Sequence, residues 1–122
     1  PSTRSLLGLV RHLTQVERVW LAERFLGEPE LELYGPGDAD FEVTEADEES
    51  VAATFARYAE VAAACRRIVA EADLDAITAV PHARTGEHFS LRWILIHLVE
   101  EYARHNGHAD LLREAIDGAV GE

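Results

Sequence analysis

Three long stretches of the chain place apolar side chains at intervals of three and four residues, and this periodicity constrains the fold more than any other feature. Such spacing is typical of amphipathic helices that bury one face against a core. It predicts helices over residues 5–26, 46–72 and 90–117. Residues 28–43 and 73–89 carry the glycines and prolines that are typical of loops, and neither segment predicts a sheet. The sequence therefore predicts an all-α, up-and-down helical bundle.

The length and composition fit a single domain that spans residues 1–122. Hydrophobic residues make up 48% of the chain and charged residues 28%, which is typical of a globular protein with its own core. No apolar run approaches the roughly 18–20 residues that a membrane span needs. No charged leader precedes an apolar segment, so we expect a cytoplasmic protein. The single Cys65 excludes an intramolecular disulfide.

The charge balance argues against two classes of partner. Acidic residues outnumber basic residues by 23 to 11, and the formal net charge is −12. Nucleic acids and anionic membrane surfaces favour basic patches, so we expect neither as a partner. The chain also lacks a glycine-rich phosphate loop, a nucleophile elbow and a CxxC pair. The candidate chemistry therefore rests on the histidines and the acidic residues near them.

The predicted helix over residues 90–117 carries four ionisable side chains at spacings of four, four and three, which places them on one face. They are His97, Glu101, His105 and His108. His105 falls in the middle of the apolar stripe, and Glu101 lies on its flank. A carboxylate beside a core is costly unless it is paired or bound to a metal. A Glu and a His one turn apart can bind the same cation, and zinc accepts such a mixture of ligands.

A third ligand must come from a facing helix, and the helix over residues 5–26 offers His12. Gly8, one turn earlier, would allow another backbone or a ligand to come close. Gly107 interrupts the last helix, where we expect a close packing contact or a bend. Two plainer interpretations stay open for the ionisable groups: a hydrogen-bonded polar seam, or a solvated face beside Arg104.

Other side chains that could carry chemistry are interpreted as structural. His82 and His88 fall in a predicted loop, where solvation is the simplest expectation. Cys65 lies on the apolar face of its helix and is expected to be a buried, inert thiol. Four aromatic residues are expected in the core or at its boundary: Trp20, Tyr58, Trp93 and Tyr102.

Two parts of the sequence resemble the DinB-like superfamily. Residues 5–13 (SLLGLVRHL) and 16–20 (VERVW) resemble its second helix. Residues 91–110 (LRWILIHLVEEYARHNGHAD) resemble its last helix. The similarity covers essentially the whole chain. It is closest to the actinobacterial branch related to mycothiol S-transferases and to the metal domain of mycothiol-dependent maleylpyruvate isomerase.

This resemblance implies a four-helix bundle that holds one divalent metal, commonly zinc or nickel. In that fold one His comes from the second helix, and two ligands lie one turn apart on the last helix. The common pair is two His residues, whereas the mycothiol isomerase branch has a Glu and a His. Carried over to this chain, the implied ligands are His12, Glu101 and His105, with His97 as the alternative ligand.

The resemblance also implies an activity. The metal would activate a low-molecular-weight thiol, mycothiol, towards an electrophilic small molecule, in an S-transfer or an isomerisation. Arg11, Arg104 and His108 are the candidates to bind the thiol, and no catalytic residue is assigned. Two alternatives stay open, a non-catalytic metal-binding or sensing module and a helical interaction module. Metal content and thiol-dependent turnover discriminate between the three.

One departure from the superfamily concerns the number of helices. The superfamily has a further helix before the segment that matches Pro1 onward, whereas the periodicity here predicts three helices. The chain also contains no Met, so we expect that residues before Pro1, including that first helix, are absent from it. Three helices would leave an apolar groove uncovered, so we expect either a homodimer or a visibly open groove.

Overall fold

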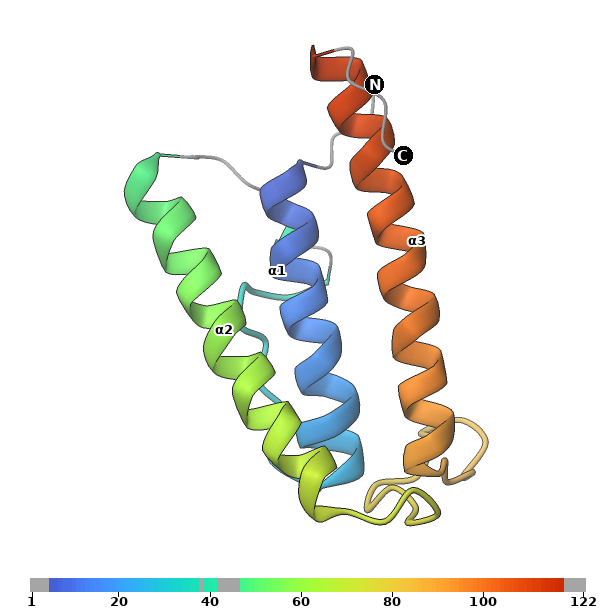
Figure 1. Ribbon diagram of the computed structural model, residues 1–122. Coiled ribbons are helices and arrows are strands. Elements are labelled where there is room, and N and C mark those ends of the chain that lie inside the picture. The colour runs from blue at the N-terminus through green and yellow to red at the C-terminus, as the bar shows by residue number, and fades with distance from the viewer. Residues whose placement is uncertain (1–4, 38, 42–46, 118–122) are drawn as a thin grey trace.

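The computed structural model describes residues 5–37, 39–41 and 47–117, and long helices dominate this part of the chain (Figure 1). The elements are α1 (Leu6–Glu17), its continuation η1 (Arg18–Phe25), the short 3₁₀ turn η2 (Ala39–Phe41), α2 (Glu48–Glu71) and α3 (Leu91–Asp117). The described residues contain no β-strand. The predicted all-α fold with three long helices is therefore confirmed.

Each long helix begins at a side chain that satisfies a free backbone donor. The Ser5 hydroxyl accepts a hydrogen bond from the Gly8 N–H at 3.0 Å and caps α1. Asp47 caps α2 in the same way, and Ser90 accepts a hydrogen bond from the first turn of α3. The first N–H groups of a helix lack partners within it, so these oxygens determine where each helix starts.

The directions of the helices differ from a strict up-and-down order. α1 and α2 run in the same direction, because Arg11 contacts Thr54 and, further along, Glu17 contacts Cys65. α3 runs opposite to both (Figure 1). The reason is the long connection after η1, which returns along the bundle before α2 begins. As a result α1 packs against both α2 and α3.

The last part of the first helix, η1, is π-helical. Its hydrogen bonds span five residues, as between the Leu26 N–H and the Leu21 carbonyl at 3.2 Å. The helix ends at Phe25 and is capped by Leu26, and the next residue, Gly27, has a φ of 85°, in a region that residues with a side chain rarely adopt. The predicted helix end near residue 26 is therefore confirmed.

The apolar core lies at the end of the bundle where α3 begins. Its buried members come from η1, α2 and α3: Leu21, Phe25, Cys65, Leu91, Ile94 and Leu98. The connection between α2 and α3 closes this end, with a backbone hydrogen bond from the Ala79 N–H to the Phe25 carbonyl at 3.0 Å. These contacts join the three helices into one packed unit.

An apolar groove of about 780 Å³ is open between α2 and α3. Leu21, Val69 and Leu98 are among its lining residues, and Val99, which also lines it, is 69% exposed. The open groove is one of the two outcomes expected from the helix count. The other outcome, a homodimer, stays a prediction.

The longest helix, α3, continues through Gly107 to Asp117. Apart from its chain neighbours and the backbone of its own helix, no described atom lies within 4 Å of a Cβ built at Gly107, so the close packing contact expected there is absent. The glycine faces open space, and the other expected outcome, a bend in the helix, stays a prediction. None of the described helices, α3 included, is long and apolar enough to cross a membrane.

Candidate metal centre

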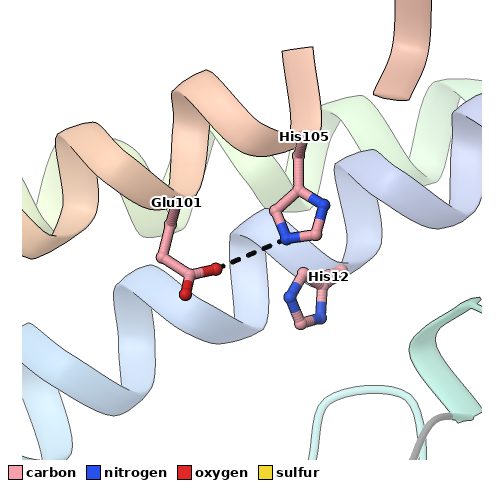
Figure 2. Close-up of side chains that lie close together, drawn as sticks. All are labelled: His12, Glu101 and His105. Atoms are coloured by element: carbon pink, nitrogen blue, oxygen red, sulfur yellow. Dashed lines mark ion pairs between the residues drawn. The ribbon is translucent and has the colours of Figure 1, made fainter. Parts of the chain in front are cut away.

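Three side chains from α1 and α3 converge on one point (Figure 2). His12 comes from α1, and Glu101 and His105 come from successive turns of α3. Each residue offers one potential ligand atom, and these three atoms lie within 4.8 Å of one another. The His105 Nε2 is 3.4 Å from the Glu101 Oε2, and the centroids of the two imidazole rings are 4.7 Å apart. The structure thus brings together the three predicted metal ligands, whereas metal binding itself stays a prediction.

Antiparallel packing of α1 and α3 explains the convergence. Trp20 on η1 lies against His97 on α3, with ring centroids 4.9 Å apart. His12, eight residues before Trp20, meets His105, eight residues after His97. Equal spacing on two helices that run in opposite directions keeps the two rows in register. The Trp20–His97 contact and the His12–His105 contact therefore lie one after the other along the same α1–α3 interface.

The candidate centre is largely buried. The exposed fraction of the side chain is 8% for His105, 14% for Glu101 and 23% for His12. Burial lowers the pKa of His105 because it penalises the imidazolium form, and the nearby His12 acts in the same direction. The neutral imidazole is the form that binds metals. His105 is therefore in the protonation state that a ligand needs.

Two further side chains contact the Glu101 carboxylate. The His97 Nε2 and an Arg104 guanidinium nitrogen lie 3.6 and 3.3 Å from its Oε1. The other oxygen faces His105, so both oxygens have partners that are positive or can become positive. His97 thus lies beside the three candidate ligands without being one of the group. These pairs also fit the polar-seam interpretation, because they satisfy the carboxylate within the chain.

The sequence did not single out Asp40, which the structure places against His12. The Asp40 Oδ2 lies 2.8 Å from the His12 Nδ1. Its Oδ1 accepts a hydrogen bond from the Phe41 backbone N–H at 2.9 Å. The Phe41 ring stacks on the imidazole of His12, with centroids 4.3 Å apart and an interplanar angle of 23°. Asp40 was missed because it lies in a predicted loop, where no periodicity relates it to a helix.

One signal for this contact was present in the sequence, namely Gly8. A Cβ built at Gly8 would lie 2.8 Å from the Phe41 carbonyl oxygen, closer than real Cβ atoms approach. The missing side chain therefore allows the backbone of η2 to pack directly on α1. The expectation that another backbone comes close to Gly8 is confirmed, although it did not identify the segment.

The donor set fits a divalent cation. Two imidazole nitrogens and one carboxylate oxygen are ligands that zinc accepts, and nickel also binds imidazole. The His105 Nδ1 is buried and has no hydrogen-bond partner among the described residues. The contacts of that ring are made on its other side, where Nε2 faces Glu101. The nitrogen nearest to Glu101 is therefore the one available for shared coordination.

Comparison with known protein families gives a match over almost the whole chain. A family model described as Mycothiol-S-transferase matches residues 1–118. The chain belongs to the mycothiol-S-transferase family. This match confirms the resemblance to the mycothiol S-transferase branch. No curated protein and no solved structure matches the chain.

Three further residues were predicted to bind the thiol, and they lie in different surroundings. Arg104 borders the candidate centre, and its side chain is 65% exposed. Arg11 points towards α2, donates a hydrogen bond to the Thr54 hydroxyl at 3.4 Å, and lies over the ring of Tyr34. His108 is half-buried further along α3. Ligand binding by these residues stays a prediction for this member of the family.

Proposed function

We propose that this protein is a divalent-metal-dependent thiol S-transferase that uses mycothiol and acts on an electrophilic small molecule. Thiol-dependent isomerisation is the alternative reaction. The proposal rests on the convergence of His12, Glu101 and His105 in a chain of the mycothiol-S-transferase family. Zinc is the metal that the donor set favours, followed by nickel. A cytoplasmic location and a homodimer are parts of the same proposal.

The number and charge of the ligands support a catalytic role. Three protein ligands leave a position open on a tetrahedral metal, which is typical of catalytic sites. A bound divalent cation favours the thiolate form of a thiol ligand, which is the nucleophilic form. Glu101 contributes one negative charge, and the two histidines bind as neutral rings. The centre therefore retains a positive charge that attracts the thiolate.

The thiol of the protein itself takes no part in this scheme. Cys65 is 2% exposed and lies in the core. Burial raises its pKa to about 12, so it stays protonated at neutral pH. The new bond to the electrophilic carbon is therefore formed by the sulfur of the bound thiol. In the same step that carbon loses its bond to a leaving group, or its π bond in an addition, and the departing electron pair takes up a proton from solvent, to which the thiol has given its own.

A second candidate function is a non-catalytic helical module. It is favoured by the partners of Glu101, because Arg104 and His97 pair with the carboxylate within the chain. A polar seam of this kind would fix the register between α1 and α3 without a metal. The open groove between α2 and α3 would then be an interaction surface. Metal content separates this candidate from the enzyme.

The test combines metal analysis of the purified protein with a conjugation assay. The assay compares mycothiol with other low-molecular-weight thiols, before and after removal of the metal. We expect about one metal ion per chain, and turnover that requires both the metal and mycothiol. Full turnover by the metal-free protein would contradict the proposal.

A pair of variants on α3 sharpens the test. Glu101→Gln keeps the size of the side chain but removes its charge. We expect zinc affinity to fall by at least roughly 10–100-fold. Loss of a residue that only hydrogen-bonds to a metal ligand already has an effect of this size, and Glu101 is proposed as a ligand itself. Glu100→Gln is the matched control, because Glu100 is next to Glu101 in the chain but its side chain is exposed. Equal zinc affinity in the two variants would favour the non-catalytic module.

A further inference from the structure

The imidazole of His12 has three described neighbours: a carboxylate at Nδ1, a ring stacked on one face, and a second imidazole at a steep angle. The Asp40 Oδ2 is 2.8 Å from its Nδ1. The Phe41 ring covers one face at a centroid distance of 4.3 Å. The His105 ring meets it at 67°, with centroids 4.7 Å apart. A flipped ring would lose the contact with Asp40, so these neighbours define one orientation.

Asp40 is itself held firmly, although it lies in a connection between helices. It is 7% exposed, and each of its oxygens has a partner. The second partner is the Phe41 N–H, on the same short turn η2. That turn packs against α1 where Gly8 lacks a side chain. A buried carboxylate needs partners of this kind, and the bond to His12 joins the turn η2 to α1.

The chemistry of the pair determines which nitrogen of His12 carries the proton. An ionised carboxylate accepts hydrogen bonds and cannot donate them, so the proton between the two groups belongs to Nδ1. In a neutral imidazole, a proton on Nδ1 leaves the lone pair on Nε2. Figure 2 shows the His12 ring beside Glu101 and His105, which are the other members of the candidate centre.

We propose that Asp40 is a positioning residue that sets the tautomer and the orientation of His12, so that Nε2 is the nitrogen presented to Glu101 and His105. A hydrogen bond from a ligating histidine to a carboxylate also makes the free nitrogen a stronger base. The turn η2 therefore contributes a residue that orients a candidate metal ligand. This inference rests on the proposed metal site, but the tautomer can be measured without a metal.

The decisive variant is Asp40→Asn, which keeps the size but replaces one oxygen with an NH₂ group. If the amide oxygen keeps the Phe41 N–H, the NH₂ group faces the His12 Nδ1 and requires an acceptor there. The proton of the imidazole then moves to Nε2, which loses its lone pair. We expect zinc affinity to fall by about 10–100-fold, measured by competition with a chromophoric chelator.

Nitrogen-15 NMR of the metal-free protein provides the second readout. We expect the Nδ1–H tautomer of His12 in the parent protein and a shift towards the Nε2–H tautomer in Asp40→Asn. The matched control is Asp75→Asn, which removes the charge of a carboxylate that is 81% exposed and paired with Arg92. This control should change neither the tautomer nor the zinc affinity.

The possible outcomes separate the two proposals. An Nε2–H tautomer in the parent protein overturns the inference without any variant, even if Asp40→Asn fails to fold. An unchanged tautomer, or a zinc affinity equal to that of Asp75→Asn, overturns it as well. A parent protein that binds neither zinc nor nickel overturns the proposed function instead. In that case the tautomer still decides whether Asp40 orients His12.

Discussion

Two glycines inside helices offer a matched test of how η2 packs on α1. Gly8→Ala would place a Cβ 2.8 Å from the carbonyl oxygen of Phe41, whereas Gly107→Ala would place one in open space. Both substitutions reduce the backbone entropy lost on folding, which favours the helix by about 0.5–1 kcal/mol. Only the first also creates a clash.

The structure determines the size of the difference. Ordinary contacts of a Cβ begin near 3.4 Å, so the Phe41 backbone must move by several tenths of an ångström to accept Gly8→Ala. Overpacking of this kind costs about 1–3 kcal/mol. We therefore expect Gly8→Ala to lower the free energy of unfolding by about 0.5–2 kcal/mol. Gly107→Ala should raise it by up to about 1 kcal/mol.

Urea denaturation of the metal-free protein, followed by far-ultraviolet circular dichroism, measures both changes. Gly8→Ala should also weaken zinc binding, because Phe41 and Asp40 lie on the same turn against His12. Gly107→Ala should leave zinc affinity unchanged. Equal stabilisation by the two substitutions would show that η2 does not pack on Gly8, and it would refute the reasoning.

Three further predictions concern the Cys65 thiol in the core and the Tyr102 hydroxyl in the groove. Because burial raises the pKa of Cys65 to about 12, the native thiol should resist iodoacetamide near pH 8 and react in denaturant; rapid labelling of the native protein would contradict this. The thiol of the unfolded chain has a pKa near 9.0, so it loses its proton at a lower pH than the native thiol does. The free energy of unfolding should therefore fall as the pH rises from about 9 towards 12. Cys65→Ala should make this fall smaller. Tyr102→Phe removes the hydroxyl that donates to Glu17 and lies 2.9 Å from the Tyr58 hydroxyl, and should lower the free energy of unfolding by about 1–3 kcal/mol. Tyr34→Phe is its control in the same urea titration, since the Tyr34 hydroxyl is buried without a hydrogen-bond partner in the described part of the chain, and an equal loss in both variants would contradict the reasoning.

The helices and the Glu101–His105 pair of the candidate centre could be predicted from the sequence because both depend on local geometry. Side chains three or four residues apart share a face of a helix whatever surrounds it. The pairing of Glu101 with His105 follows from that spacing alone. His12 was identified from its place on an apolar stripe, and the family resemblance supported the same choice.

The same local reasoning was insufficient wherever a neighbour had to be named. Gly107 was expected to mark a close packing contact or a bend, and the structure excludes the packing contact because the glycine faces open space. Gly8 met that expectation, but the sequence could not say that Phe41 is the neighbour. Arg11 donates a hydrogen bond to Thr54, a neighbour that the sequence could not name, and its predicted role in binding the thiol stays a prediction.

The sequence by itself determined the helices, their buried faces and the spacing of the candidate ligands on α3, since these depend on residues a few positions apart. Only the tertiary structure decided that α1 and α2 run in the same direction and that Asp40 meets His12 across 28 positions. Those features depend on the connection between η1 and α2, which returns along the bundle (Figure 1). No repeating pattern of side chains encodes such a path, because it is set by which distant surfaces pack together.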